Sequence, residues 1–233
     1  MNPAQAAFSG PRVAILAALP RELGPLVRDW PARSGSRSEG FLIAECDRAI
    51  AVCAGMGSER VTLAMELAER KGPLSQVVSV GYAGALRSGI AACTLFWPST
   101  VIDAPTGVRY TCEEGNGTLV STDHVVNHGE KLQMAAHWDA DLVDMEAATV
   151  AKLAGERGLR FRALRVVSDE AEEMLPELDR FTDPHGGFRE ADFAAYVLLR
   201  PWLIPKSVRM GRHAAKASQA MARELSIFLG QAD

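Results

Sequence analysis

Two acidic stretches decide how this chain is interpreted: Val143-Asp144-Met145-Glu146-Ala147-Ala148 and Arg165-Val166-Val167-Ser168-Asp169-Glu170-Ala171. Each follows an apolar run and delivers carboxylates at the edge of a regular element, where a buried sheet usually meets a cleft. Desolvating a carboxylate is costly, so acids in such places need either partners or a function. We therefore take these two stretches as the first candidates for a functional site.

Around them, short apolar runs alternate with longer amphipathic segments. Strands are predicted at 12–19, 41–44, 49–54, 75–80, 95–102, 118–121 and 162–167, and helices at about 59–71, 132–138, 144–157 and 207–229. Pro20 and Glu22 suit the first turn of a further helix. This alternation is typical of an α/β fold with a central, mostly parallel or mixed sheet.

Size and composition restrict the possible functions. A chain of 233 residues with 48% hydrophobic residues fits a single domain over 1–233, with 1–11 expected to be flexible. The net charge of −4 gives no indication of nucleic-acid binding. No apolar run approaches the roughly 20 residues that span a bilayer. Four scattered cysteines without a CxxC pair, and no evident signal peptide, favour the cytoplasm.

Two predicted strands end in glycine-containing turns, Gly55-Met56-Gly57 and Gly81-Tyr82-Ala83-Gly84. Glycine lets a ligand approach the backbone closely, and such turns at strand ends form the usual ligand crevice of open α/β sheets. Taken singly, each motif is more often only a tight turn.

The acids themselves have both bland and functional interpretations. Asp144 and Glu146, at the start of a predicted helix, could simply complement its dipole. Met145 suits either the core or the floor of an apolar pocket. Asp169 beside Ser168 could be a helix N-cap, or a general acid if burial raises the pKa of its carboxyl group. His124 and His128 are four residues apart, but no acidic or cysteine ligand completes a set and there is no HExxH pattern, so no metal site is expected.

Taken in order, these segments resemble the nucleoside phosphorylase and nucleosidase superfamily, and most closely the methylthioadenosine/adenosylhomocysteine nucleosidases. The resemblance runs from about Arg12 to Ala171. It rests on the opening strand with Glu22, on the two glycine turns, and on Val143-Asp144-Met145-Glu146-Ala147 and Val167-Ser168-Asp169. It implies a three-layer α/β sandwich with a central mixed sheet, of the phosphorylase/hydrolase type, that cleaves a ribosyl N-glycosidic bond.

The resemblance also implies a role for particular residues. Asp169 would protonate the leaving purine, oriented with help from Ser168, and Glu22 would position or activate the attacking water. Glu146 would hold the ribose hydroxyls. The remaining implied substrate-binding residues are Met145, Met56, Gly81, Tyr82, Val125 and Val126. The implied partner is a small-molecule nucleoside, with a possible homodimer and no metal or organic cofactor.

Three alternatives stay open. Water as the nucleophile is favoured, because Ser79 stands where phosphorylases of the hexameric bacterial type place an arginine; Arg21 could still support phosphate as a co-substrate. Tyr82 and the stretch after Asp169 depart from the nucleosidase pattern, and that stretch resembles the hopanoid-associated phosphorylases, which implies an adenosyl group on a large polyterpene. A non-catalytic nucleoside-binding protein is the third. The stretch 172–190 is the best candidate for a loop over the site.

Overall fold

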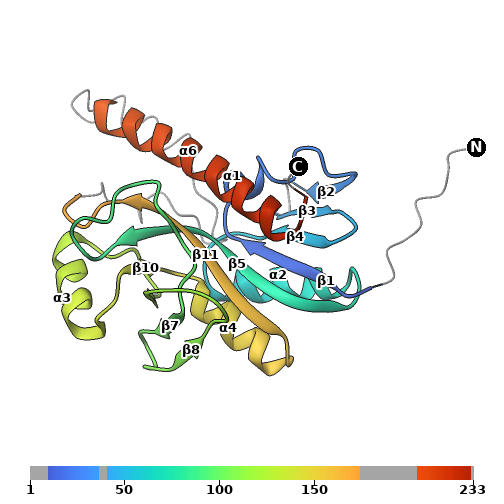
Figure 1. The fold of residues 1–233 in the computed structure, drawn as a ribbon, viewed down its shortest axis with the longest axis horizontal. Helices are drawn as coiled ribbons and strands as arrows, with labels where there is room; N and C mark the ends of the chain where they lie inside the picture. The colour runs from blue at the N-terminus through green and yellow to red at the C-terminus, as the bar shows by residue number, and fades with distance from the viewer. Residues whose placement is uncertain (1–9, 37–40, 174–203, 232–233) are drawn as a thin grey trace, which may run out of the picture.

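The computed structural model describes residues 10–36, 41–173 and 204–231, which form a three-layer α/β sandwich around a mixed sheet (Figure 1). Its described helices are α1 (Pro20–Leu23), α2 (Ser58–Glu69), α3 (His128–Trp138), α4 (Ala147–Glu156) and α6 (Ile204–Phe228). Helices α2 and α4 cover one face of the sheet, and α1 and α6 cover the other. The predicted fold class is therefore confirmed.

The sheet has 11 strands within the described residues, in the order β2-β3-β4-β1-β5-β10-β9-β7-β8, with β11 paired to β5 and β6 paired to β11. The strands are β1 (Arg12–Ala17), β2 (Ala32–Ser36), β3 (Phe41–Glu45), β4 (Ala49–Cys53), β5 (Leu74–Ala85), β6 (Leu95–Phe96), β7 (Thr100–Asp103), β8 (Arg109–Thr111), β9 (Thr118–Ser121), β10 (Leu142–Asp144) and β11 (Arg160–Asp169). The central pairs β1–β4, β1–β5 and β5–β11 are parallel, whereas β2–β3, β3–β4 and β5–β10 are antiparallel.

Two strands, β1 and β10, share one edge of strand β5. Strand β11 occupies the opposite edge of β5 from Gln76 to Gly84. Strand β1 therefore pairs with the remaining edge as far as Val80, and β10 takes over that edge from Gly84. Because neither strand pairs with the residues between them, the backbone of β5 at 81–83 is left for groups outside the sheet.

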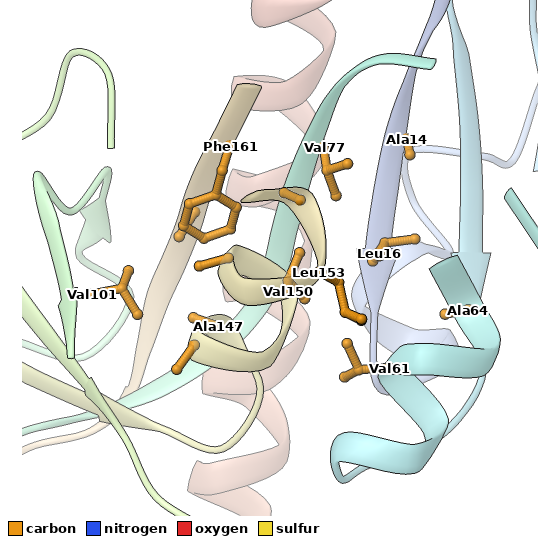
Figure 2. Packing of buried hydrophobic residues seen from close by; sticks show 14 of the residues in the cluster. Ala14, Leu16, Val61, Ala64, Val77, Val101, Ala147, Val150, Leu153 and Phe161 are labelled. Atoms are coloured by element: carbon orange, nitrogen blue, oxygen red, sulfur yellow. The ribbon is translucent and has the colours of Figure 1, made fainter. Parts of the chain in front are cut away.

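Alternation along the strands divides the core between the two faces. Ala14 and Leu16 of β1 pack toward α2 and α4, together with Val61 and Val150 (Figure 2). Their neighbours Ile15 and Ala17 belong to the other cluster, which includes residues of α1 and α6. A side-chain period of two in a strand with both faces covered explains why β1 reads as a continuous apolar run.

A buried ion pair crosses the sheet between β10 and β11. The Arg165 guanidinium donates to Asp144 through Nε at 2.9 Å and Nη2 at 2.5 Å, and both side chains are at most 1% exposed. Arg165 also donates to the backbone oxygen of Ser79 at 2.8 Å and to its hydroxyl at 2.7 Å. Ser121 donates to the second oxygen of Asp144 at 2.5 Å. With these donors the buried charges are hydrogen-bonded as well as paired, as burial of charge requires.

The same pair sets the start of α4. Asp144 accepts from the backbone N–H of Ala147 at 3.0 Å, and the Ser121 hydroxyl accepts from that of Ala148 at 3.0 Å. These two N–H groups lie in the first turn of the helix, where no backbone acceptor is available. Asp144 therefore caps α4 from the preceding strand and ties it to β11.

Some predicted elements are wrong in detail. Asp144 ends a strand rather than starting a helix, and α4 begins at Ala147 with Glu146 as its N-cap. Residues 81–84, predicted as a turn, continue strand β5 because β11 pairs with them. The predicted strand 95–102 is two strands, β6 and β7, and the short strands β2 and β8 were not predicted.

Other predictions concern residues that the structure does not describe. The stretch 172–190 is described only to Glu173, and most of the stretch after Asp169 that resembles the hopanoid-associated phosphorylases, residues 174–203, lies outside the described residues, as do residues 1–9. Among the described helices, none has both the length and the apolar character needed to cross a membrane.

Replacing Asp144 by asparagine is expected to lower the free energy of unfolding by about 3–5 kcal/mol, because the Arg165 guanidinium would stay buried without its counter-charge. The control is Glu66→Gln, which removes an exposed pair with Arg70 and is expected to cost less than about 1 kcal/mol. Urea denaturation of the three proteins measures both effects. Equal losses in the two variants would contradict a central role for the buried pair.

Candidate active site

The predicted acids meet along four residues of β5, from Gly81 to Gly84. Glu22 lies against Gly81, and Asp169 lies against Gly84. Ser168 donates to the backbone oxygen of Ala83 at 3.2 Å. This is the segment where the edge of β5 passes from β1 to β10, so the break in strand pairing is where the functional side chains gather.

Glu22 is held by backbone donors at the start of α1. Its Oε2 accepts from the N–H groups of Ala18 at 3.0 Å and Leu19 at 2.8 Å, while Oε1 has only a 3.4 Å contact with the N–H of Tyr82. A side chain on Gly81 would place its Cβ 3.3 Å from that oxygen, so glycine keeps Oε1 accessible from β5. Burial raises the pKa of Glu22, and the N–H of Leu19 and the charge of Arg165 partly oppose the rise.

Glu146 lies near the glycine turn 55–57 and near the charges of Asp144 and Glu22. Its pKa is raised to about 8, mainly by burial and also by the negative charges of Asp144 and Glu22, whereas Arg165 and the backbone N–H of Gly57 oppose the rise. The side chain nevertheless keeps partial solvent access, as do its neighbours Met145 and Met56. A carboxyl group that is largely surrounded by protein and still accessible to water suits a ligand-binding group.

Asp169 ends β11 with both carboxylate oxygens engaged. Ser168 donates to Oδ1 at 2.5 Å, and the ammonium of Lys131 on α3 donates to Oδ2. The same ammonium donates to the backbone oxygen of Glu170 at 3.1 Å. Asp169 is therefore not the N-cap of a helix, and it is the only predicted site acid that forms a salt bridge to a lysine among the described residues.

Val125 and Val126, which the resemblance implies as substrate-binding residues, differ in exposure. Val125 is partly exposed, whereas Val126 is 7% exposed and packs in the small core between α3 and strands β7, β9 and β10. Only Val125 therefore offers much side-chain surface to a ligand. A contribution from Val126 would come from its backbone.

Tyr82 connects the site to the C-terminal helix. Its hydroxyl lies 2.7 Å from that of Ser218 and 3.3 Å from the backbone oxygen of Ala214, both on α6. The Arg21 guanidinium stands 5.6 Å from the centre of its ring, within cation–π range. Tyr82 thus fills space between α1, α6 and β5, next to Glu22.

Two residues of this site carried no role in the sequence interpretation, Arg165 and Lys131. Arg165 is a charge inside an otherwise apolar strand, which is a usable signal, because such a charge needs a buried partner. Lys131 gave a weaker signal, a cation in the first turn of a helix, where it opposes the helix dipole. Among the described residues there is no group of three or more His, Cys, Asp or Glu that could hold a metal ion.

The raised pKa values of Glu146 and Glu22 predict how stability depends on pH. Between the ordinary carboxyl pKa of 4.5 and about 8, the folded state binds more protons than the unfolded state. The free energy of unfolding should therefore be highest near pH 5 and fall as the pH rises to 8. Glu146→Gln, which mimics the protonated group, should fall less steeply, and the exposed control Glu59→Gln should follow the wild type. Denaturant titrations at pH 5, 6.5 and 8 measure the slopes; identical slopes in all three proteins would be inconsistent with this assignment.

Residues 108–195, which contain both acidic stretches, match the family model described as the phosphorylase superfamily. No curated protein sequence matches the chain. Similar solved structures include the methylthioadenosine nucleosidase MTAN of Helicobacter pylori, a mutant with 5′-methylthioadenosine in its active site. Its TM-score is 0.69 at 15% identity, with 96% of this chain and 100% of that chain covered.

Two further structures have the same fold. The 5′-methylthioadenosine/S-adenosylhomocysteine nucleosidase of S. pneumoniae, with a transition-state inhibitor, has a TM-score of 0.69 at 16% identity, covering 95% of this chain and 100% of that chain. The futalosine hydrolase of Helicobacter pylori has a TM-score of 0.67 at 17% identity, covering 95% and 98%. The family match and the shared fold together confirm the resemblance to the nucleoside phosphorylase and nucleosidase superfamily that the motifs predict.

Proposed function

We propose that this protein is an enzyme that hydrolyses the N-glycosidic bond of a purine nucleoside. The observation that carries the proposal is that Glu22 and Asp169 lie against Gly81 and Gly84 of β5, with Glu146 close enough to Glu22 for that charge to raise its pKa. Cleavage of this bond passes through a positively charged, oxocarbenium-like sugar. It needs an acid for the leaving base, a base for the nucleophile and negative charge near the sugar, and three acids in one site supply these functions.

Asp169 is assigned to the leaving base. A purine that departs as an anion is a poor leaving group, and a proton delivered to a ring nitrogen makes it a neutral one. Asp169 lies at the end of β11, against Gly84, so it stands at the carboxyl edge of a central parallel strand. In open α/β sheets this edge is where ligands bind.

Glu22 is assigned to the attacking water, and Glu146 to the ribose. Oε2 of Glu22 is fixed by two backbone donors, so Oε1 is the oxygen left to take a proton from water. Burial raises the pKa of Glu22 and brings it closer to that of a base that works near neutral pH. Glu146 is anchored at the N-terminus of α4 and has solvent access, so its carboxyl group can hydrogen-bond sugar hydroxyls.

The electrostatics of the candidate site favour water over phosphate. A phosphate nucleophile needs cationic or amide donors around it. Arg165 is adjacent, but Asp144 and Ser79 already engage its guanidinium. Burial and the charges of Asp144 and Glu22 raise the pKa of Glu146 to about 8, which marks a site where an added anion is disfavoured. Hydrolysis is therefore the better assignment.

The group at the 5′ position is the open part of the substrate. Tyr82, Arg21 and α6 lie together beside Glu22, and they are the described groups that would face this part of the sugar. The similar structures contain methylthioadenosine or act on futalosine, according to their names. The first substrates to assay are therefore methylthioadenosine, adenosylhomocysteine, futalosine and adenosine, and an adenosylated polyterpene alcohol tests the hopanoid alternative.

Release of the base is expected to proceed without phosphate. With the best of these substrates, the rate should change less than about twofold between phosphate-free buffer and buffer with about 50 mM phosphate, a concentration well above common phosphate affinities. The sugar product should be the free ribose derivative. Chromatography of both products measures this. Strict dependence on phosphate, with the sugar 1-phosphate as product, would show a phosphorylase instead.

Asp169→Asn is expected to lower kcat by a factor on the order of 100 or more, because asparagine does not supply the proton. Substrate or product binding, measured by calorimetry, should stay within about tenfold, that is about 1.4 kcal/mol. Asp47→Asn, in the exposed turn before β4, is the matched control and should keep full activity. A protein that binds nucleosides but shows no turnover in wild-type form would be a binding module rather than an enzyme.

A further inference from the structure

Lys131 occupies an unusual place for a lysine. It is the only fully buried residue of α3, with 2% of its surface exposed, while the adjacent Leu132 is 59% exposed. Lysine is almost never fully buried unless it is paired, and an exposed leucine beside a buried lysine reverses the usual pattern of a surface helix. The arrangement costs stability unless the ammonium is needed inside.

The position within the helix is also unfavourable for a cation. Asn127 caps α3, and its capping box with Glu130 places Lys131 at the end of the first turn. The helix dipole is positive there, so a cation is disfavoured. Neither packing nor helix stability therefore explains Lys131, and its contact with Asp169 does.

The helix is docked so that this contact forms. His128, one turn before Lys131, lies 3.1 Å from the backbone oxygen of Ala171, and Lys131 donates to that of Glu170. Both contacts tie α3 to the residues just after Asp169. A Cβ on Gly84 would lie 3.0 Å from Asp169 Oδ2 and 3.4 Å from Lys131 Nζ, so the pair fills the space that this glycine leaves.

Both carboxyl oxygens of Asp169 have a hydrogen-bonding partner in the structure. As a carboxylate, Asp169 accepts hydrogen bonds at both oxygens, from the Ser168 hydroxyl and from the Lys131 ammonium. An ionised carboxylate only accepts hydrogen bonds, so it cannot protonate a base in this state. The hydroxyl of Ser168 is a very weak acid, which leaves the ammonium of Lys131 as the proton donor in contact with Asp169.

On the basis of the proposed function, we infer that the acid for the leaving base is the Lys131–Asp169 pair, and that Lys131 is the source of the proton. Moving a proton from Nζ to the carboxylate turns an ion pair into a neutral amine and a carboxylic acid, with no change of net charge. Desolvation penalises both ions of a buried pair, and the neutral form avoids that penalty. Ser168 accommodates it, because its hydroxyl can turn to donate to the backbone oxygen of Ala83 and accept from Asp169 instead.

The step balances as follows. An N–H bond of the Lys131 ammonium breaks and an O–H bond forms on Asp169. That O–H bond then breaks as an N–H bond forms on the purine, and the glycosidic C–N bond breaks with its electron pair going to the base. Water adds to the sugar cation and gives a proton to Glu22. After the products leave, solvent returns a proton to the Lys131 amine and takes one from Glu22.

Lys131 acts through Asp169 and is therefore a positioning residue in this scheme. Comparing substrates whose leaving groups do and do not need a proton tests its role. Lys131→Met keeps the chain length without the proton and is expected to lower kcat for the purine nucleoside by about 100-fold, as general acid catalysis of this size predicts. On a 4-nitrophenyl riboside, whose leaving group needs no proton, its kcat should stay within about threefold. The double variant with Asp169→Asn should lose little more than either single variant, because the two residues act as a unit.

Lys131→Arg separates charge from proton supply. Arginine restores the cation and its hydrogen bonds but does not release a proton, so it should restore thermal stability without restoring purine cleavage. Lys152→Met, an exposed lysine of α4, is the control and should behave as the wild type. Gly84→Ala leaves both charges in place and crowds the pair, so it should also lower kcat on the purine substrate selectively.

The outcomes are distinguishable. Normal purine cleavage by a folded Lys131→Met, full rescue by arginine, or equal losses on both substrates would each overturn this inference and leave the proposed function intact. If the wild type cleaves no purine nucleoside, the proposed function fails first, and the inference fails with it. Melting temperatures of all variants show whether a loss of activity reflects unfolding.

Discussion

The buried ion pair between Asp144 and Arg165 is the interaction on which the rest of the structure depends. It joins the last residue of β10 to the middle of β11, and Arg165 reaches across to Ser79 of β5. The same carboxylate caps α4 and thereby places Glu146 at the helix start. Such a pair is a costly way to gain stability, since desolvation offsets much of its attraction. The pair instead makes the fold more specific, because it connects three strands and a helix in one register beside the site.

The second constraint is the divided edge of β5. A strand in the middle of a parallel sheet normally has no backbone groups to spare. Here β1 leaves at Val80 and β10 arrives at Gly84, so a short central segment is open to side chains. Glycines at both 81 and 84 let carboxyl groups approach within van der Waals contact of the backbone. The candidate site therefore lies at a gap in strand pairing.

How far this could be predicted from the sequence differs between the fold and the site. Continuous apolar runs, as in β1, β4 and β11, are strong signals because both faces of these strands are covered, and the strands were predicted there. The three-residue strands β8 and β10 are too short to show a period, and their existence depends on pairing with distant residues. For the same reason Asp144 was assigned to a helix: only the contact with Arg165 distinguishes a strand end from a helix start.

The site residues divide in the same way. Glu22, Glu146 and Asp169 could be selected from motifs, because each follows a recognisable strand or turn. Lys131 could not be selected in this way, because its importance comes from a contact with Asp169, which lies 38 residues further along the chain. A lysine on an amphipathic helix is solvated in most proteins. Sequence patterns therefore identify the acids at strand ends well, and they identify poorly the groups on separate helices that determine what those acids can do.

The acids and cations of the candidate site link these observations. At neutral pH two of its carboxyl groups, Glu22 and Glu146, have pKa values raised by burial, and Asp169 is paired with a cation. An enzyme that separates charge in its transition state benefits when the acids near the sugar and the acid near the base differ in their environments. Here the difference comes from the placement of two cations. Arg165 pairs with Asp144 and Lys131 pairs with Asp169, and of the two side-chain types only lysine readily exchanges its proton. An arginine in the structural pair and a lysine beside Asp169 match the roles that are proposed for the two pairs.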